Sequence, residues 1–537
     1  MARKKKKRAS HGDGPVSTRS SKSQKSLSGD SAKSQRTQPV PASPGRAGTT
    51  SLQTLLPVLL FFVCFGAYVS NGDFLPSDDA KGNMLASVNL LKRHTFSLSP
   101  PNAPGSFSWV LERPGEKPHT VAVHEWSGEV DDLYAQGHLK AENKYYVAQT
   151  THHEEYVNSF GLGAAMTALP VYAFLDLFVD IESNRYWWWH GGALTASFLT
   201  AFAAVCVFLA ARRFVSPLPA LLTALAFGLG SCVWPISSQA LWQHPANTFF
   251  LSLGACLLLG IPQRRDYAVY CGAALGMAVL CRPTSAIVVV CVGAYLLWAN
   301  RRRLPGYVLG GLPFALILAL YNGYYFGSPF EFGQTVASKN IALASTGSED
   351  LWQSPILESL PGLFISPSRG LVFYSPVLLF GLVGAVLAWK DRRYRPLIPL
   401  QAATLVLIVV AAKWFDWWGG STYGYRPIVD TAPFFALMMI PVIDRVVSSR
   451  WMLSLFVALL LWSAAVQFVG AWSYSISGWT SQWRDYNNPD RASLWQWTRP
   501  QIVYHVANFR SERATKKRSQ KRQTQARVPI LYLSPPK

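Results

Sequence analysis

The sequence has few charged residues for its length. Only 15% of its 537 residues are charged, whereas 50% are hydrophobic and 13% are aromatic. Average globular domains carry about 25% charged residues, so this composition argues against a large water-soluble protein. Apolar runs of roughly 16 to 22 residues recur along the chain, and a helix of about 20 residues crosses the hydrocarbon core of a bilayer. The sequence therefore predicts a polytopic membrane protein.

Cysteine is scarce, and its placement argues against a disulfide framework. All seven cysteines lie inside or at the ends of apolar runs, and none lies in a long hydrophilic loop. Disulfide-stapled domains instead carry their cysteines in loop-rich, exposed segments. The chain also lacks an Asn-x-Ser/Thr acceptor site, which fits a bacterial envelope better than a secretory membrane.

Several catalytic signatures are missing as well. The sequence contains no Gly-x-x-x-x-Gly-Lys-Ser/Thr phosphate loop, no Gly-x-Ser-x-Gly elbow and no His-Glu-x-x-His metal helix. These absences argue against a protein powered by cytoplasmic ATP, and against a hydrolase or metalloprotease of those types.

The positive charge is concentrated at the two ends of the chain. Residues 1–48 hold twelve Lys/Arg and two Asp, residues 510–537 hold nine Lys/Arg and one Glu, and together they contribute +18 of the net charge of +21. The composition of residues 1–48 predicts a disordered basic tail. We interpret it as a cytoplasmic segment that touches anionic lipid, with nucleic-acid binding as the alternative. The predicted partners accordingly include the membrane and no nucleic acid.

We predict eleven transmembrane helices within an all-α domain over residues 49–472. The expected spans are 52–69, 188–210, 216–234, 244–261, 266–281, 284–299, 306–322, 371–389, 396–412, 430–444 and 451–472. Basic clusters follow the second, fourth, sixth, eighth and tenth spans, as the positive-inside rule requires if the N-terminus is cytoplasmic. This orientation places the N-terminus inside a bacterial inner membrane and leaves residues 473–537 as an extracytoplasmic C-terminal segment with a basic tail.

The largest expected extracytoplasmic segment is the first loop, residues 70–187. Within it, the apolar stretch 156–178 is interrupted by Gly161, Gly163 and Pro170. Counting this stretch as a span would invert the side of every later basic cluster. We therefore expect helices that lie in the membrane interface.

An acidic pair, Asp78 and Asp79, directly follows the first span. Apolar residues then recur at helical spacing, which predicts an amphipathic helix that starts at the pair. One acid can be an N-cap. A carboxylate held at the membrane surface can instead have a raised pKa and act as a general base on a hydroxyl.

This order of elements resembles the GT-C glycosyltransferases, which include bacterial aminoarabinose transferases and protein O-mannosyltransferases. The resemblance covers most of residues 52–472 and includes the stretches Cys281-Arg282-Pro283-Thr284, Ser366-Pro367-Ser368-Arg369-Gly370 and Trp417-Trp418-Gly419-Gly420, which leads to Tyr423-Gly424-Tyr425-Arg426-Pro427. It implies an inverting transferase that takes a sugar from a polyprenyl-phosphate donor to a glycan, lipid or protein acceptor on the non-cytoplasmic face. The family's first acid falls on Asp79 and its usual following Glu falls on Ala80, so Asp79 is the expected base and Asp78 the runner-up.

Three arginines are candidates for binding the donor phosphate. The span map puts Arg426, Arg369 and Arg282 at the outer face, and arginine pairs with phosphate through two parallel hydrogen bonds. The alternative is that they anchor loops at headgroup level. His244, Trp417 and Trp418 are candidate sugar or acceptor contacts, with an aromatic-belt role as the alternative.

A divalent metal is compatible with the sequence, and its best candidate ligands are His153, Glu154 and Glu155. Adjacent side chains diverge, so this cluster is too compact to converge on one ion, and a solvated loop is the competing interpretation. The rival function is a transporter or flippase of lipid-linked sugars. Transporters place ionisable residues at mid-membrane, whereas those here gather at the ends of spans and in outer loops. A non-catalytic membrane scaffold is a third interpretation.

Overall fold

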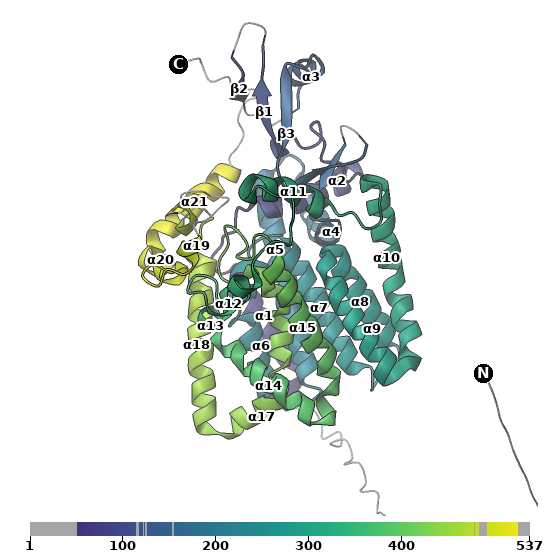
Figure 1. Cartoon of the computed structure of the whole chain (residues 1–537), viewed down its shortest axis with the longest axis vertical. Helices are drawn as coiled ribbons and strands as arrows, with labels where there is room; N and C mark the ends of the chain where they lie inside the picture. Colours follow the sequence, from purple (N-terminus) through teal and green to yellow (C-terminus); the bar gives the residue numbers. More distant parts are fainter. Residues whose placement is uncertain are drawn as a thin grey trace, which may run out of the picture. The chain divides into compact units, whose positions relative to one another are not determined.

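The described part of the chain is mostly helical. The structure, a computed structural model, describes residues 51–113, 117–121, 123, 126–152, 155–476, 478–482 and 491–524, so the predicted tail 1–48 lies outside it. The helices are α1 (Ser51–Val69), α2 (Asp78–Arg93), α3 (Gly128–Ala135), α4 (Gly163–Asp176), α5 (Arg185–Ala211), α6 (Pro217–Gly228), α7 (Gln243–Gly260), α8 (Tyr267–Cys281), α9 (Ala286–Asn300), α10 (Leu304–Phe326), α11 (Gly333–Thr346), α12 (Ile356–Ile365), α13 (Leu371–Tyr374), α14 (Leu379–Lys390), α15 (Ile398–Lys413), α16 (Ala432–Leu437), α17 (Ile440–Ser448), α18 (Arg450–Ser473), α19 (Arg491–Leu494), α20 (Gln501–Ala507) and α21 (Phe509–Thr524) (Figure 1).

Each of the eleven predicted spans coincides with a helix or a pair of short helices. Within the described ranges, four helical stretches are long and apolar enough to cross a membrane: Arg185–Ala211, Pro283–Phe326, Arg392–Lys413 and Arg450–Ser473. A fifth is added if the bent pair Arg426–Leu437 and Ile440–Ser448 is one span. The chain is therefore a membrane protein, while the count of eleven spans stays a prediction.

Three predicted spans are interrupted rather than continuous. The stretch 216–234 ends as α6 at Gly228 and continues into a π-helical turn, Val233–Ser237. The stretch 371–389 breaks between α13 and α14 because Ser375 precedes Pro376, and a residue before proline is disfavoured in the helical region. The stretch 430–444 bends by 59° between α16 and α17.

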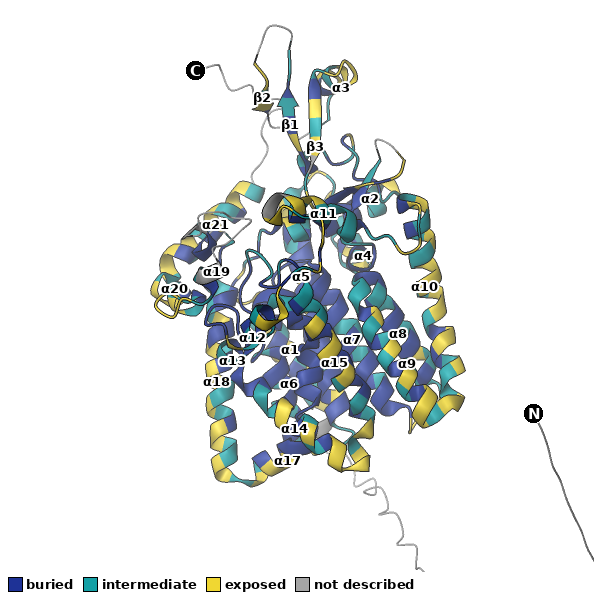
Figure 2. Cartoon of the chain, viewed as in Figure 1, coloured by how far each residue is buried: buried dark blue, intermediate teal, exposed yellow. Residues whose placement is uncertain are grey.

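Apolar side chains face outward on the peripheral helices. Leu309, Leu316 and Leu320 are exposed on α10, and Trp451, Leu455 and Trp462 are exposed on α18. Figure 2 shows exposed residues along both helices and buried residues in the helices between them. Exposed apolar surface of this extent marks a face that contacts other apolar material, and in a membrane protein that material is lipid.

Small residues allow α8 and α10 to pack closely. A Cβ atom added at Gly272 would clash with the backbone of Tyr307, and one added at Gly310 would clash with the backbone of Val269. Small residues at helix contacts let backbones approach in this way, which gains van der Waals contact where the hydrophobic effect between helices is weak.

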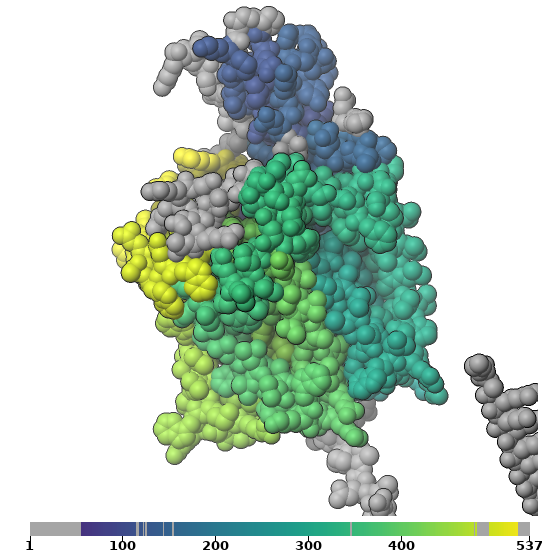
Figure 3. Space-filling view, in the orientation of Figure 1, coloured from purple at the N-terminus to yellow at the C-terminus, as the bar shows by residue number. Residues whose placement is uncertain are grey.

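The first loop contains β-structure, which corrects the expectation of an all-α chain. Strands β1 (Phe107–Leu111), β2 (His119–Val121) and β3 (Leu139–Asn143) form an antiparallel sheet in the order β2-β1-β3, and β4 (Val147–Gln149) pairs with β5 (Tyr156–Asn158). The strands are short, with only three to five residues, and polar between their apolar positions, so periodicity alone gave them little signal. The buried residues of β1, β2 and β3, with Val147 of β4 and Leu85 of α2, belong to a separate hydrophobic core. Figure 3 shows this loop gathered at one end of the helices.

The C-terminal helices pack against α18 and reach the first loop. The Lys516 ammonium donates to the Ala471 carbonyl oxygen at 2.7 Å, and the Gln520 amide donates to the carbonyl oxygen of Phe74. Helix α21 also contacts α5. Residues 501–524 therefore lie at the same end of the helices as the first loop.

Candidate functional site

Segments from distant parts of the chain enclose a cavity of about 670 Å³. Its lining includes Asp78 and Asp79 at the start of α2, Tyr145 and Phe160 of the first loop, Trp242 and His244 at the start of α7, Arg282 between α8 and α9, Gln334 of α11, and several residues of 414–427, among them Arg426. The cavity therefore collects both predicted acids, two of the three predicted arginines and the predicted histidine. We call it the Asp79 cavity.

Asp79 lies in the first turn of α2, and its side chain is only 15% exposed. Arg426 donates to one carboxylate oxygen of Asp79, and the Tyr145 hydroxyl donates to the other. Asp78 is exposed, and Ser77 at the N-cap makes no side-chain capping bond. The acid that bonds to these cavity residues is therefore Asp79, while Asp78 also lines the cavity but is exposed.

The pKa of Asp79 is lowered, which corrects the sequence-based expectation that it would be raised. Burial acts to raise this pKa, but the charge of Arg426 and the hydrogen bonds from Tyr145 and Arg426 outweigh burial. Burial and the adjacent Asp79 carboxylate raise the pKa of Tyr145 well above its usual value. At neutral pH the pair is thus an Asp79 carboxylate that accepts a bond from a neutral phenol.

Arg426 is held by an aromatic ring and a histidine as well as by Asp79. Its guanidinium carbon lies 4.1 Å from the centroid of the Trp242 ring, a distance typical of a strong cation–π contact. Its Nε donates to Nε2 of His244 at 3.4 Å. These contacts fix the guanidinium plane at the cavity wall while its side chain remains 20% exposed.

His244 connects Arg426 to a second ion pair. Its Nδ1 lies 3.1 Å from Oδ1 of Asp430, and Arg282 donates to the other Asp430 oxygen. We assign the tautomer with the proton on Nδ1, because it then donates to Asp430 while Nε2 accepts from Arg426. The result is a continuous chain of polar contacts from Tyr145 through Asp79, Arg426, His244 and Asp430 to Arg282.

Another wall of the cavity is a glycine-rich loop that follows α15. Gly419, Gly420 and Gly424 all have φ between +63° and +79°, a backbone conformation that glycine adopts without steric cost. The turn lets the Gly420 amide donate to Oδ1 of Asp416 at 2.8 Å. Burial raises the pKa of Asp416 to about 7, opposed by that amide and by the charges of Arg426 and Arg369. Asp416 is thus an acid beside the cavity that titrates near neutral pH.

Arg369, the third predicted phosphate ligand, does not line the cavity. Its side chain is fully buried, and it donates to the carbonyl oxygens of Trp418 at 3.1 Å and Gly420 at 3.2 Å. It also donates to Oε1 of Gln501 in α20 at 2.7 Å and lies 5.2 Å from the Trp479 ring centroid. The structure thus places Arg369 behind the glycine-rich loop, where it holds that loop to the C-terminal helices.

The two predicted tryptophans lie on different sides of the cavity wall. Trp418 lines the cavity, as does Trp414. Trp417 is fully buried and packs against Gly362 of α12, where an added Cβ atom would clash with its ring. Of the pair, only Trp418 is placed to contact a ligand in the cavity.

Of the three predicted metal ligands, the structure describes only Glu155, and this residue does not line the cavity. His153 and Glu154 lie outside the described residues. Across the parts of the chain that the structure describes, no group of three or more His, Cys, Asp or Glu residues is arranged to hold a metal ion.

Sequence reasoning missed three residues of the polar chain and its surroundings: Tyr145, Asp416 and Asp430. Asp416 and Asp430 flank the motif that contains Arg426, and Asp430 stands four residues after it. Their proximity in sequence to Arg426, a predicted phosphate-binding residue, was a signal that could have identified them. Tyr145 carried none, because only tertiary packing brings the first loop onto α2.

The comparisons with known proteins gave structural similarities only. No protein-family model and no curated protein matches the chain. The chain is similar to the oligosaccharyltransferase AglB of Archaeoglobus fulgidus, solved with an inhibitory peptide and a dolichol-phosphate, at a TM-score of 0.49 and 11% identity. It is also similar to ArnT of Cupriavidus metallidurans, solved with undecaprenyl phosphate, at a TM-score of 0.45 and 12% identity.

The extent of these similarities differs between the two proteins. The match covers 79% of this chain but only 56% of the AglB chain, so this chain spans little more than half of AglB. For ArnT it covers 88% of this chain and 78% of that chain. Likenesses at this level say nothing about what this chain binds or transfers.

Proposed function

We propose that this protein is a membrane glycosyltransferase that moves a sugar from a polyprenyl-phosphate donor to an acceptor, with inversion at the anomeric carbon. One observation carries the proposal: Asp79, Arg426 and Arg282 come from three distant segments and face the same cavity, joined through His244 and Asp430. A proton acceptor next to two arginines supplies both groups that such a transfer needs, a base for the hydroxyl and cations for the phosphate.

The two arginines hold the departing phosphate in this mechanism. The side chains of Arg426 and Arg282 remain 20% and 19% exposed, so part of each arginine side chain is accessible from the cavity. A guanidinium binds phosphate through two parallel charge-assisted hydrogen bonds. Because the lipid phosphate is already a good leaving group, fixed cations and correct positioning supply most of the required stabilisation.

Asp79 receives the proton of the acceptor hydroxyl. Inversion requires the acceptor oxygen and the leaving phosphate on opposite faces of the anomeric carbon, so Asp79 and Arg426 must separate around the bound sugar. A phosphate that competes for Arg426 removes the main influence that lowers the pKa of Asp79. Donor binding therefore turns Asp79 into a stronger base at the moment when a base is needed.

Asp416 is a third carboxylate of the same cavity, after Asp78 and Asp79, and its proposed role differs from that of the base. With its pKa near 7, it exchanges a proton readily at neutral pH. We assign it a role beside the acceptor hydroxyls, while Asp79 remains the proposed base and Asp78 the runner-up. Trp418 is the proposed sugar contact, because its ring lines the cavity, whereas both ring nitrogens of His244 are bonded to Asp430 and Arg426.

The protein would act as a multi-pass protein with a cytoplasmic N-terminus, in a bacterial inner membrane. The donor's isoprenoid chain would lie in the bilayer and its phosphate would enter the Asp79 cavity from the non-cytoplasmic side. The basic clusters that follow every second predicted span support this orientation.

The test compares Asp79→Asn with Asp78→Asn. Radiolabelled lipid extracts from cells with and without the protein identify the donor sugar and the acceptor, and purified protein is then assayed for transfer. We expect Asp79→Asn to lower kcat by roughly 10²- to 10⁴-fold while donor binding persists. Asp78→Asn is the matched control, because this neighbouring acid is exposed, and we expect it to retain transfer.

Other outcomes separate the alternatives. Unchanged transfer by Asp79→Asn eliminates Asp79 as the base, and a loss confined to Asp78→Asn assigns the role to the runner-up. Movement of the lipid-linked sugar across proteoliposome membranes without transfer identifies a flippase instead.

A further inference from the structure

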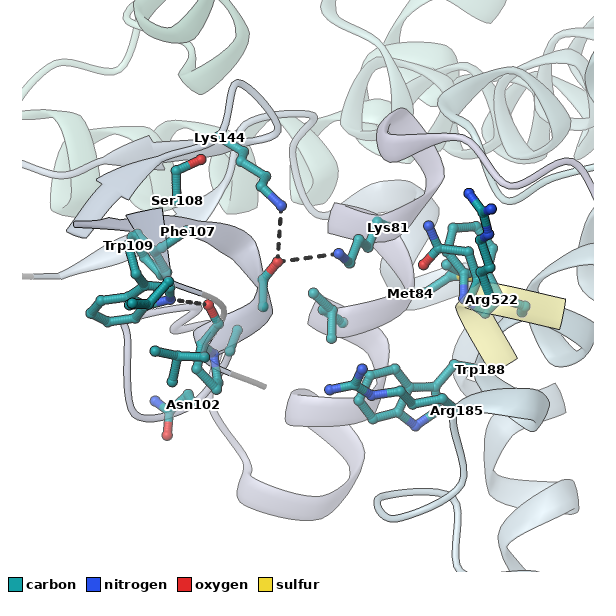
Figure 4. Close-up of a pocket in the computed structure, with 18 of the residues that line it drawn as sticks. Lys81, Met84, Asn102, Phe107, Ser108, Trp109, Lys144, Arg185, Trp188 and Arg522 are labelled. Atoms are coloured by element: carbon teal, nitrogen blue, oxygen red, sulfur yellow. Dashed lines mark hydrogen bonds between the residues drawn. The ribbon is translucent and has the colours of Figure 1, made fainter. Parts of the chain in front are cut away.

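A second cavity, of about 460 Å³, lies beside the Asp79 cavity. It is formed by α2, strand β1 with the turn before it, the start of α5 and the end of α21 (Figure 4). It shares Gln523 of α21 with the Asp79 cavity, and its Lys81 stands two residues after Asp79. We call it the Lys81 cavity.

The charged residues described in the lining of the Lys81 cavity are all cationic. Lys81, Lys144, Arg185 and Arg522 line it, and no carboxylate does so among the described lining residues. The four cations come from α2, the first loop, α5 and α21, so tertiary folding brings them together. The nearest acid that acts on Lys81 is Asp78, which lines the neighbouring cavity.

Two of these cations converge on one oxygen atom. The Lys81 and Lys144 ammonium groups both donate to the Gly105 carbonyl oxygen, at 3.2 Å and 3.3 Å, as the dashed lines in Figure 4 show. Burial together with the charge of Lys144 lowers the pKa of Lys81 to about 8. Like charges held this close repel each other, and one neutral carbonyl does not compensate them. A bound dianion would remove this repulsion.

Much of the remaining wall is apolar and aromatic. Met84 and Leu85 of α2, Trp109 of β1, and Trp188 and Trp189 of α5 line the cavity. Arg185 stacks near Trp188, with 5.9 Å between the guanidinium carbon and the ring centroid. A ligand that fits this wall carries an apolar or ring-shaped portion next to its negative charge.

We propose that the Lys81 cavity binds the acceptor of the transfer through a phosphate group on that acceptor. This inference rests on the proposed function and narrows it to a phosphorylated acceptor. The two cavities share Gln523, so an acceptor anchored at Lys81 and extending past Gln523 would bring a hydroxyl to Asp79. Arg522 of α21 is one of the four cations that line this cavity. The basic C-terminal segment thereby contributes to substrate binding.

The experiment measures occupancy of this cavity alone, with no turnover. Ser108→Cys introduces a thiol at an exposed position of β1 that lines the Lys81 cavity and is absent from the Asp79 cavity. Its reaction with N-ethylmaleimide in the purified full chain is followed by peptide mass spectrometry. Ser183→Cys, in an exposed turn outside the cavity, is the control thiol.

Two probes distinguish the sources of the phosphate. We expect inorganic phosphate and dodecyl phosphate both to slow modification of the Ser108→Cys thiol and to leave the Ser183→Cys thiol unaffected. Protection by dodecyl phosphate at a much lower concentration indicates a lipid-borne phosphate, and equal protection indicates that the phosphate group alone is recognised. If neither probe protects the thiol, the proposal is wrong.

A second experiment removes the charges of Lys81 and Lys144. In the Ser108→Cys background, Lys81→Met with Lys144→Met is expected to raise the phosphate concentration for half-protection by about tenfold or more, since each lost charge-assisted hydrogen bond weakens binding. Lys140→Met is the matched control, because Lys140 lies on β3 near Lys144 but bonds to Glu112 and is 60% exposed. Unchanged protection in the double variant overturns the proposal.

The outcome is independent of the test at Asp79. Protection that depends on Lys81 and Lys144 can be found even if Asp79→Asn keeps full transfer, in which case the base assignment fails and this site stands. Transfer that requires Asp79, without any protection at the Ser108→Cys thiol, removes only the present proposal.

Discussion

The two neighbouring cavities balance their charges in opposite ways. In the Asp79 cavity each arginine already has a carboxylate partner: Arg426 pairs with Asp79, and Arg282 pairs with Asp430. In the Lys81 cavity, two ammonium groups share the Gly105 carbonyl, and no described lining residue is an acid. Among the described residues, the arginines of the first cavity thus have carboxylate partners in its wall, whereas Lys81 and Lys144 of the second share one neutral oxygen.

This difference implies two kinds of binding. A phosphate that enters the Asp79 cavity must exchange partners with a carboxylate, so its net gain in affinity is small but the exchange changes the basicity of Asp79. A phosphate that enters the Lys81 cavity neutralises repelling cations and displaces no carboxylate among the described lining residues. Under the two proposals, the Asp79 cavity would serve the chemistry of the transfer and the Lys81 cavity would serve capture of the acceptor.

Of the variants that test this difference between the two cavities, Arg426→Gln has the largest expected effect. This change removes the cation that pairs with Asp79 and that would hold the donor phosphate, and we expect kcat to fall by roughly 10²- to 10³-fold. Steady-state transfer kinetics measure it. Arg264→Gln is the control, because Arg264 forms an exposed ion pair with Asp266 and is not among the residues that line the Asp79 cavity. A loss of less than a few fold would show that Arg426 does not contact the leaving group.

Arg369→Met separates a structural role from a ligand role. Because Arg369 is buried and bonds to the carbonyl oxygens of Trp418 and Gly420, its loss leaves buried acceptors unpaired, at a cost of roughly 3 kcal/mol. We expect a clearly lower Tm in detergent. If the Tm is unchanged and only donor affinity falls, Arg369 binds phosphate as the sequence suggested.

Asp416→Asn sharpens the assignment within the Asp79 cavity and has the smallest expected effect, about tenfold or less in rate. Since burial raises the pKa of Asp416 to about 7, its carboxylate forms as pH rises through 7. Transfer by the unmodified protein should therefore increase across that range. The variant should lose this rise in transfer rate near pH 7. If the rise persists in the variant, a group other than Asp416 causes it.

Much of the fold could be predicted from the lengths of the apolar runs in the sequence. The runs over 52–69, 188–210 and 451–472 correspond to α1, α5 and α18, because a long apolar helix is encoded locally by composition. The breaks at Ser375 and between α16 and α17 were missed, since a hydropathy pattern averages over the few residues at which a helix bends. The sheet of the first loop was missed because its strands gain their stability from the separate core that they share with α2.

The candidate site was partly accessible for the same reason. Asp79, Arg282, His244 and Arg426 stood at the ends of predicted helices, where polar residues in an apolar chain are conspicuous, and the structure brings all four to one cavity. Arg369 carried the same signal but is buried behind the glycine-rich loop. Position along the chain therefore indicated which end of the membrane domain a residue occupies and left its contacts open.

The sequence by itself determined that the chain is a helical membrane protein, because apolar run length is a local property that needs no knowledge of contacts. Only the tertiary structure decided that Tyr145 donates to Asp79, that Asp430 joins His244 to Arg282, and that Lys81 meets Lys144 at one carbonyl. Charges interact over a few ångströms whatever their separation in sequence, so pairing, burial and pKa values follow from packing.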